Sequence, residues 1–504
     1  MTNVLDYLSD TVRKYPDKPA FIDEKNTLTF KELQSAVESV GTSLIHKGCD
    51  KEPVLVYMNK SADEIAAFFG VIAAGCYYVP IDSEMPLLRI QKIVENLDAR
   101  ICIVDSETKD SAQGLGFTGE ILSYDDIKNE EPDKDELKRV HDEAIDIDPI
   151  YIVFTSGSTG VPKGVIACHR SVIDYIEQLS DVLEVSADTV FGNQAPLYFD
   201  ACLKELYPTI KFGATTYLIP KELFSQPLRL VEYLNDKQIN TICWVVSALT
   251  IVSAFKTFNK TVPKYLKTIA FGSEVFAIKQ FNLWRNACPE ARFINLYGPT
   301  EATGMSCYYE VKKEFSEGEA IPIGRPFKNT QVLLLKEDGT LAENGEEAEI
   351  CLRGTCVTLG YYNDPERTAA AFVQNPLQKN FTELIYRTGD IARYNSDGDL
   401  VFVSRRDNQI KHMGHRIELG EIEAAVSQLD GISLTGCIYD DKKEKIVLYY
   451  TGDISEAEVI NGLKVLVPRY MLPNRVLKIE EMLFTPNGKI DRKSLKQKYY
   501  SEQG

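Results

Sequence analysis

Residues 151–165, which read YIVFTSGSTGVPKGV, place a loop of hydroxyls and glycines directly after an apolar, strand-like run. The glycines allow the backbone to approach an anion closely, and the hydroxyls, free N–H groups and Lys163 suit phosphate oxygens. The spacing differs from that of a Walker A loop. A flexible Ser/Gly linker is the alternative, but linkers rarely lie between a buried strand and a Pro-Lys-Gly turn. The segment therefore predicts a phosphate-binding loop.

The first part of the chain alternates strand-like and helix-like segments. They are residues 53–58, 61–74, 77–81, 86–97 and 101–104. Ser61 is suited to cap the first helix and Gly75 to end it. The alternation indicates βαβ units, and hence an α/β fold with parallel sheets flanked by helices. The charged segment 129–148 is predicted to lie on the surface.

The character of the sequence changes after about residue 405. Residues 405–408 form a polar break, and the segments that follow read as a helix, two strands and another helix. Their ranges are 419–429, 432–438, 446–451 and 455–467. We therefore predict a large N-terminal domain, residues 1–406, and a small α+β C-terminal domain, residues 407–504, which has an ordinary domain size.

Composition narrows the possible partners and compartment. With 56 Lys and Arg against 74 Asp and Glu, the net charge of -18 argues against nucleic acid or an anionic membrane as the main partner. We see no signal peptide pattern and no apolar run long enough to span a bilayer, so we expect a cytoplasmic protein. The 11 cysteines contain no C-x-x-C pair, and the five histidines lack metal-ligand spacing. Free, mostly buried thiols in a reducing compartment are expected.

Further motifs, together with the Ser/Gly loop, strongly resemble the adenylate-forming superfamily over nearly the whole chain. That group includes the adenylation domains of nonribosomal peptide synthetases, D-alanine–carrier-protein ligases, acyl-CoA synthetases and luciferases. The motifs occur in the order typical of the superfamily. They are GCYYVPID at 75–82, NLYGPTEAT at 295–303, YRTGD at 386–390, RRDNQIK at 405–411, GHRIELGEIE at 414–423 and PNGKIDR at 486–492.

The resemblance implies an ATP- and Mg²⁺-dependent enzyme that activates a carboxylic acid as an acyl-adenylate. It implies that Glu301 binds Mg²⁺, which prefers hard oxygen ligands, and that Asp390 binds the ribose diol, which a carboxylate can accept. Either carboxylate read alone fits an ordinary turn. Ser404 replaces the usual glycine before Arg405. The implied nucleotide contacts are Thr155, Ser156, Gly157, Ser158, Thr159, Gly160, Lys163, Asn295, Tyr297, Gly298, Thr300, Asp390 and Arg405.

The resemblance also implies two residues that act through movement of the C-terminal domain. Lys489 would enter the site during adenylation and neutralise charge between the substrate carboxylate and the α-phosphate. Asp407 would be the hinge about which the domain then rotates to admit a thiol. The alternatives are a solvated lysine after an Asn-Gly turn and an ordinary linker aspartate.

Asp200 is the most informative residue for the substrate. It follows an apolar-aromatic run, and the resemblance implies that it binds the α-ammonium of an amino acid. A structural aspartate satisfied by the backbone is the alternative. Lys204 would pair with an acidic substrate side chain if it points inward, whereas a surface lysine is the commoner case. The other pocket positions implied by the motifs are Ala201, Ser247, Ile269, Phe271, Leu296, Gly304 and Met305.

Several readings of substrate and partner stay open. The chain ends at Gly504, soon after the lysine loop, so we expect a separate phosphopantetheinyl carrier protein as thiol acceptor. A basic patch of Arg405, Arg406, Lys411 and Arg416 is a candidate docking surface. A D-alanine ligase fits the length, but Gly272 stands where we expect those enzymes to carry a cysteine. The rivals are an acyl- or aryl-CoA synthetase, a luciferase-like oxygenase and a non-catalytic ATP-binding scaffold.

Overall fold

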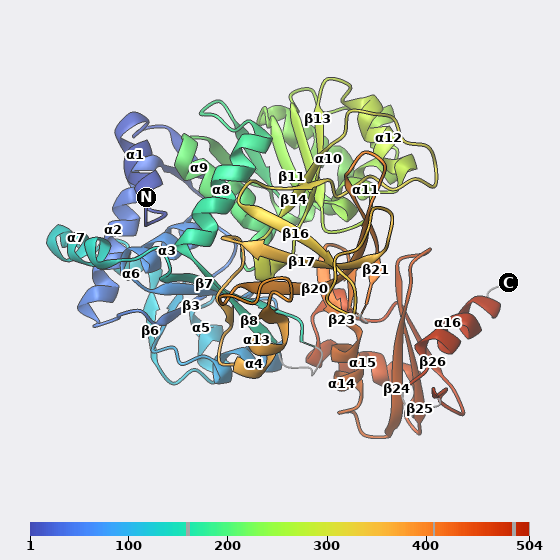
Figure 1. Cartoon of the computed structure of the whole chain (residues 1–504). Helices are drawn as coiled ribbons and strands as arrows, with labels where there is room; N and C mark the ends of the chain where they lie inside the picture. The colour runs from blue at the N-terminus through green and yellow to red at the C-terminus, as the bar shows by residue number, and fades with distance from the viewer. Residues whose placement is uncertain (158–161, 407–408, 486–489, 503–504) are drawn as a thin grey trace.

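The computed structural model describes residues 1–157, 162–406, 409–485 and 490–502. The contacts expected of Ser158, Thr159, Gly160, Asp407 and Lys489 therefore lie outside the described residues. Most of the chain forms one broad lobe, and the C-terminal part, drawn in red, forms a smaller lobe beside it (Figure 1).

A nine-stranded sheet forms the upper half of the large lobe in Figure 1. Its order is β15-β14-β13-β12-β11-β9-β10-β1-β2, and the pairs from β13 to β1 are parallel. The strands are β1 Pro19–Ile22, β2 Thr27–Thr29, β9 Val190–Asn193, β10 Thr215–Leu218, β11 Thr241–Val245, β12 Thr268–Gly272, β13 Arg292–Tyr297, β14 Cys307–Glu310 and β15 Arg325–Pro326.

A second, seven-stranded sheet has the order β18-β8-β7-β4-β3-β5-β6, and its strands from β7 to β6 pair in parallel. The strands are β3 Pro53–Tyr57, β4 Tyr77–Pro80, β5 Ile101–Val104, β6 Glu120–Ser123, β7 Pro149–Thr155, β8 Lys163–Cys168 and β18 Gly360–Tyr361. The Ser/Gly loop connects β7 and β8, which form an antiparallel hairpin that pairs Thr155 with Lys163. The predicted strands are thus confirmed, and Lys163 opens a strand.

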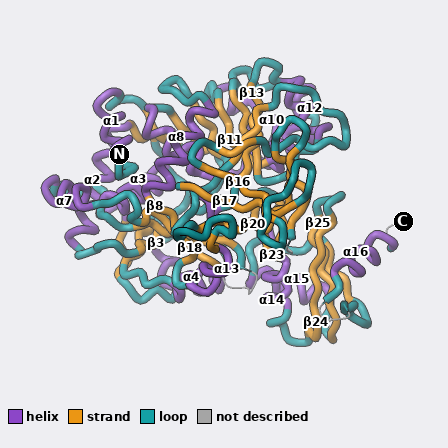
Figure 2. The backbone as a smooth tube through the Cα atoms, viewed as in Figure 1, coloured by secondary structure: helices purple, strands orange, loops and turns teal. Residues whose placement is uncertain are grey.

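Helices cover both sheets, as Figure 2 shows. In the large lobe they are α1 Asp6–Lys14, α2 Phe30–His46, α3 Ala62–Ala73, α4 Leu87–Asn96, α5 Lys109–Ala112, α6 Tyr124–Ile127, α7 Lys134–Glu143, α8 His169–Leu183, α9 Leu203–Phe212, α10 Pro227–Asp236, α11 Val246–Ala254, α12 Ile278–Ala287 and α13 Pro365–Ala371. Ser61 caps α3 by accepting a bond from the backbone N–H of Glu64, as predicted. The predicted surface segment contains α7, which buries no residue.

An antiparallel five-stranded sheet follows, which the βαβ pattern did not predict. Its strands are β16 Thr330–Leu335, β17 Ala348–Gly354, β19 Phe372–Gln374, β20 Leu384–Tyr394 and β21 Leu400–Arg405. Antiparallel neighbours need no crossover helix, so β16 pairs directly with β17, and β20 with both β19 and β21.

The smaller lobe is α+β, as predicted. Hairpin β22 Gln409–His412 and β23 His415–Glu418 precedes a sheet of β24 Ile432–Asp440, β25 Lys445–Gly452 and β26 Arg475–Lys478. Its helices are α14 Leu419–Val426, α15 Glu456–Leu466 and α16 Arg492–Ser501. The α/β class with a small α+β part is thus confirmed, while the exact boundary at 406/407 stays a prediction.

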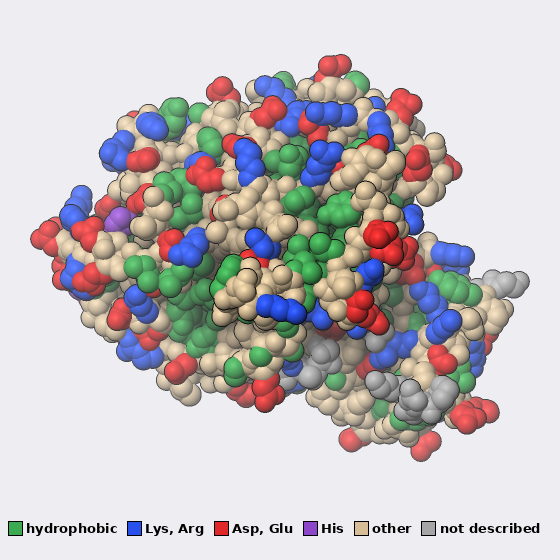
Figure 3. All heavy atoms as spheres, in the orientation of Figure 1, with side chains coloured by type: hydrophobic (Ala, Val, Ile, Leu, Met, Phe, Trp, Pro, Cys, Tyr) green, Lys and Arg blue, Asp and Glu red, His purple; other side chains and the backbone are tan. Residues whose placement is uncertain are grey.

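The cysteines agree with the compositional expectation, and one face of the surface carries charges of both signs (Figure 3). Figure 3 shows basic and acidic side chains interspersed over the face in view, without a broad basic area. All 11 cysteines are free and buried. Over the described ranges, the helices are too short or too polar for any of them to cross a membrane.

His169, at the start of α8, makes the stability of the large lobe dependent on pH. The backbone N–H of Val4 donates to its Nδ1 over 3.2 Å, so this nitrogen must be unprotonated. Burial lowers the pKa of His169 from 6.5 to about 4. Between these two pH values His169 binds a proton in the unfolded chain but not in the folded chain. Stability is therefore complete above pH 6.5 and falls as the pH drops toward 4.

We expect the free energy of unfolding to fall by about 2–3 kcal/mol over this window because of His169. Urea unfolding of the wild type and of His169→Gln at pH 7 and pH 4.5 measures the effect as a difference. The exposed His46, whose pKa is raised by its hydrogen bond to Glu130, serves as the control in His46→Gln. An equal pH dependence of the wild type and His169→Gln would contradict the assignment.

Candidate active site

Glu301 lies at the centre of the polar site, where β13 ends and the short helix η5, Thr300–Ala302, begins. Its side chain is fully buried. One carboxylate oxygen accepts from Lys163 Nζ at 3.1 Å and from the Tyr361 hydroxyl at 2.8 Å, and the other accepts from Arg416 at 2.6 Å. Three distant segments therefore meet at one carboxylate.

Charge pairing keeps this carboxylate ionised. Burial by itself raises the pKa of Glu301, but Arg416, Lys163 and the bond from Tyr361 outweigh it and hold the pKa well below its ordinary value. Burial lowers the pKa of Lys163, which Glu301 partly offsets. The arrangement is a buried cluster in which positive and negative charges balance. An anionic ligand can replace Glu301 as the partner of Lys163 or Arg416.

The described part of the Ser/Gly loop adjoins this cluster. Thr155, Ser156 and Gly157 are buried. The Ser156 hydroxyl donates to the backbone carbonyl of Arg416 at 2.8 Å, while the Thr155 hydroxyl has no partner in the described part of the chain. An unpartnered buried hydroxyl next to Lys163 is available to a phosphate oxygen.

Asp390, on β20, lies beside a second group of predicted nucleotide contacts. It accepts from the Tyr297 hydroxyl at 2.5 Å and from Arg405 at 2.6 Å. The ammonium of Lys411 lies 5.6 Å from the centre of the Tyr297 ring. A carboxylate has about four acceptor sites, so Asp390 can still accept from a diol.

Two other residues of the NLYGPTEAT motif have evident structural duties. The Asn295 amide donates to the carbonyls of Pro322, at 2.8 Å, and Ile321. At Gly298 a Cβ atom would lie 2.4 Å from the carbonyl oxygen of Gly304. Asn295 therefore positions the neighbouring loop, and Gly298 allows two backbone segments to touch.

Asp200 begins the short helix η2, Asp200–Cys202, and is half-buried beside Thr300. Burial raises its pKa, which a hydrogen bond to Thr300 and the charges of Lys204 and Arg416 partly offset. Burial and then the charge of Asp200 raise the pKa of Tyr151 and of Tyr175. Their buried hydroxyls lack partners among the described residues. Asp200 thus lies in a polar interior next to the Glu301 cluster.

Lys204 is only 4% exposed, so it is not the surface lysine that is the commoner case. Several other pocket candidates lie nearby. Leu296 and Met305 share a buried cluster with Tyr175, and Ala201 packs against that cluster. A Cβ on Gly304 would lie 3.4 Å from the Tyr175 hydroxyl.

Ile269 and Phe271 do not join this group, which corrects the pocket predicted from the motifs. They pack into a separate core with α11 and α12 on the other face of the nine-stranded sheet. Their neighbour Ala270 lies in the same cluster as Leu296. Side chains alternate between faces along a strand, so an alignment displaced by one residue selects the wrong face. Ser247, at the start of α11, binds Glu274 through its backbone N–H.

The hairpin β22–β23 contributes site residues that the sequence did not assign to the site. Its turn is held by Glu274, which accepts from the backbone N–H of Gly414 at 2.8 Å. His415 stacks on Tyr470 with 3.7 Å between ring centres and lies edge-on to Phe199 of the large lobe. It therefore lies between the two lobes.

The predicted basic docking patch is therefore wrong. Arg416 and Arg405 are engaged by Glu301 and Asp390, and burial lowers the pKa of Lys411. Only the side chain of Arg406, 52% exposed, remains at the surface. Arg405 and Arg416 of these motifs therefore pair with buried carboxylates and are not free at the surface.

Glu301 can bind Mg²⁺ if Arg416 releases the carboxylate oxygen that it holds. The cation commonly takes one or two carboxylates and completes its coordination with substrate phosphates, which a single buried glutamate satisfies. No group of three or more His, Cys, Asp or Glu suited to a metal occurs in the described ranges. Because Arg416 holds one oxygen of Glu301 in this structure, the metal and Arg416 exclude each other there.

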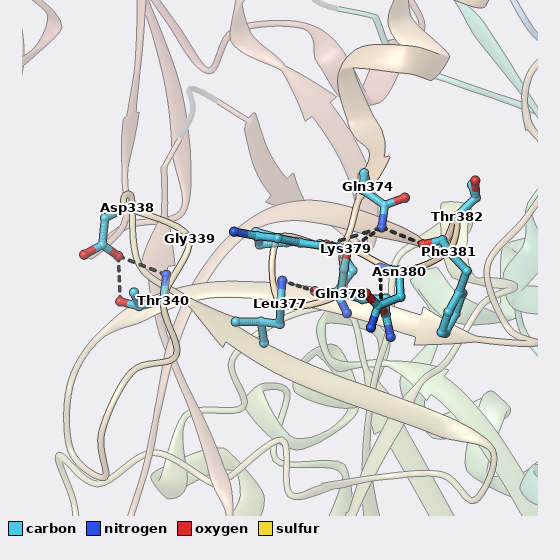
Figure 4. Close-up of a pocket in the computed structure, with 12 residues that line it drawn as sticks. Asp338, Gly339, Thr340, Gln374, Leu377, Gln378, Lys379, Asn380, Phe381 and Thr382 are labelled. Carbon is cyan, nitrogen blue, oxygen red and sulfur yellow. Dashed lines mark hydrogen bonds between the residues drawn. The ribbon is translucent and has the colours of Figure 1, made fainter.

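A surface hollow lies away from these residues. It encloses about 900 Å³ between the turn 338–340 and the loop 374–382. Figure 4 shows the polar groups of Asp338 and Gln374 bonded within their own segments, to Thr340 and to loop carbonyls. No predicted site residue lines it, and we assign it no role.

Comparison with known proteins gives consistent similarities. Residues 8–362 match the family described as AMP-binding enzyme. Tyrocidine synthase 1 of Brevibacillus parabrevis is 30% identical over 487 residues, which cover 95% of this chain and 44% of that protein. The chain thus spans less than half the length of curated relatives such as this one.

Two solved structures share the fold. The Vibrio cholerae adenylation domain AlmE, in complex with glycyl-adenosine-5'-phosphate, gives a TM-score of 0.85 at 22% identity and covers 99% of this chain and 98% of its own. Holo-PA1221, a nonribosomal peptide synthetase protein with adenylation and PCP domains, gives 0.81 at 24% identity, with 99% and 84% covered.

Proposed function

This chain belongs to the AMP-binding enzyme family, and we propose that it activates an α-amino acid with ATP and transfers it to a carrier thiol. The observation that carries the proposal is the position of Asp200. A half-buried carboxylate lies beside Thr300 and the Glu301 cluster, where it can bind an ammonium close to a phosphate site.

In the first step, a carboxylate oxygen of the amino acid attacks the α-phosphorus of ATP. A P–O bond forms, the bond to the β-phosphate bridge breaks, and pyrophosphate leaves. Bound Mg²⁺ supplies charge neutralisation for the phosphates at Glu301. Lys163 and the Thr155 hydroxyl bind phosphate oxygens, Asp390 accepts from the ribose, and Lys489, outside the described residues, neutralises the transferring group.

In the second step, a thiol attacks the acyl carbon of the adenylate. The C–S bond forms, the C–O bond to AMP breaks, and AMP leaves while the thiol proton passes to solvent. A rotation about Asp407 would exchange Lys489 for the hairpin β22–β23 between the two steps. The described arrangement, with Arg416 on Glu301, suits the second step because it leaves no place for Mg²⁺ on that oxygen.

The carrier is proposed to present a phosphopantetheine thiol. The relative holo-PA1221 combines adenylation and PCP domains, which supports this kind of partner. A carrier domain in the same chain or a separate protein would serve the same chemistry.

Amino-acid-dependent exchange of pyrophosphate into ATP tests the proposal. We expect exchange with at least one α-amino acid, in a panel that holds both enantiomers of the common amino acids together with aryl and fatty acids. Exchange only with acids that lack an amine would contradict the role of Asp200 and indicate an acyl- or aryl-CoA synthetase. Exchange with D-alanine alone would identify a D-alanine ligase.

A further inference from the structure

Lys204 is a buried lysine whose ammonium bonds to none of the described residues. It lies on α9, one helical turn after Asp200, and is 4% exposed. None of the described residues gives it a hydrogen bond or an ion pair. An isolated buried charge is costly, so such a group normally has a counter-ion. A bound ligand can supply the counter-ion of Lys204.

The carboxylates of the protein do not fill this role. Lys204 acts electrostatically on Asp200, on Glu205 and on the thiol of Cys243, but it makes no ion pair with either carboxylate. Glu205 instead accepts from the Asn193 amide at 3.3 Å, and burial raises its pKa to about 7. Burial favours the neutral form of Glu205, which is a weak partner for an ammonium.

Among the described residues, four unpartnered polar atoms belong to residues that interact with Asp200 or with Glu205, the neighbour of Lys204 in the chain, or to Glu205 itself. They are buried, and no described residue bonds them: the hydroxyls of Tyr151 and Tyr175, Oδ1 of Asn193 and Oε1 of Glu205. Buried polar atoms are normally bonded to protein, water or ligand. These atoms are available to a polar ligand.

The order of charges fixes how an amino acid would lie there. Thr300, beside the Glu301 cluster, is among the groups that lower the pKa of Asp200, so Asp200 lies close to that cluster. Lys204 lies one helical turn farther along the chain. Burial raises the pKa of Cys243 on β11, and the charge of Lys204 partly offsets that rise. The carboxylate that reacts must lie at the phosphate end and the ammonium at Asp200. The end of the side chain is therefore the part of the substrate that reaches Lys204.

We propose that Lys204 binds an anionic side chain, so that the substrate is an acidic α-amino acid of the glutamate or aspartate kind. This inference rests on the proposed function. Asp200 and Lys204 form a pair of opposite charges separated by one helical turn. A ligand with an ammonium and, a few bonds away, a carboxylate complements both, whereas an uncharged side chain leaves the ammonium unpaired.

The test compares acids with their amides, which have nearly the same shape. We expect pyrophosphate exchange with glutamate or aspartate to exceed that with glutamine or asparagine by about 100-fold in kcat/KM. In Lys204→Met, which keeps the length and removes the charge, the ratio should fall to within about tenfold. Lys60→Met is the matched control, because Lys60 is another interior lysine close to Glu205 but bonds to backbone carbonyls. Its ratio should not change.

The outcomes separate this inference from the proposed function. A wild-type preference for an uncharged amino acid would overturn the acidic substrate and leave amino acid activation intact. A preference for acids that survives in Lys204→Met would overturn the role of Lys204. Exchange only with acids that lack an amine, or with none, would overturn the proposed function itself. The wild-type panel decides the substrate class even if the variants fold poorly.

Discussion

Replacement of Glu301 by glutamine is expected to lower amino-acid-dependent pyrophosphate exchange by about 100- to 1000-fold. Glutamine keeps the shape but removes the carboxylate proposed to hold Mg²⁺ on the phosphates. It also leaves Lys163 and Arg416, both now within 3.1 Å of a carboxylate oxygen, as neighbouring positive charges without an anion. Exchange rates at saturating ATP and amino acid measure the loss.

The control for this experiment is Glu177→Gln. Glu177, on α8, is also bonded, to the Tyr7 hydroxyl at 2.6 Å and to Lys211, but it lies away from the site. It should retain nearly wild-type exchange. Raising the Mg²⁺ concentration should not restore Glu301→Gln, since the ligand itself is missing. Exchange within tenfold of the wild type would show that Glu301 has a structural role only.

The fold was predictable where local patterns and topology coincide. Ser61, the apolar strands and Gly75 gave the βαβ units of the seven-stranded sheet at nearly the right residues, because each strand is buried on both faces. The antiparallel sheet from β16 to β21 was missed. Its longest strand, β20, alternates in exposure, a weaker signal than a continuous apolar run, and β17 and β19 are separated in the chain by β18 and α13.

The site was predictable residue by residue only within its motifs. Glu301 pairs with Lys163, and Asp390 pairs with Arg405, while the roles that the motifs imply for them stay predictions. The contact between Glu301 and Arg416, 115 positions apart, depends on how the two lobes are placed, and no local pattern encodes that. The misplacement of Phe271 has another cause, because register along a strand is invisible to an alignment of motifs.

The contacts between the lobes connect the site to the proposed rotation. The hairpin β22–β23 is fixed by Glu274 at its turn and delivers Arg416 to Glu301. If Mg²⁺ and Arg416 compete for the same oxygen, the lobe arrangement and the metal state are linked, since each ligand stabilises only one arrangement. Contacts far from Glu301 that exist in this arrangement should then influence the second step selectively.

The ion pair between Arg89 on α4 and Glu421 on α14 is such a contact. It joins the two lobes, and both side chains are almost fully buried. Replacing Glu421 by glutamine leaves Arg89 buried without a counter-charge, which costs about 3–5 kcal/mol in this arrangement alone. The population of the arrangement should fall steeply, and thiol transfer should slow by about 100-fold. Pyrophosphate exchange, which belongs to the other arrangement, should stay within about twofold.

Single-turnover transfer from the enzyme-bound adenylate to pantetheine, measured beside pyrophosphate exchange, separates the two steps. Glu95→Gln is the matched control. Glu95 also lies on α4 and lines the surface groove that Arg89 and Glu421 line, but it is exposed. It should change neither rate. The double variant Arg89→Met with Glu421→Met should regain much of the transfer rate, since a buried apolar pair replaces an ion pair at little cost. Equal slowing of both steps in Glu421→Gln would mean that the pair supports the protein in every arrangement and does not select one.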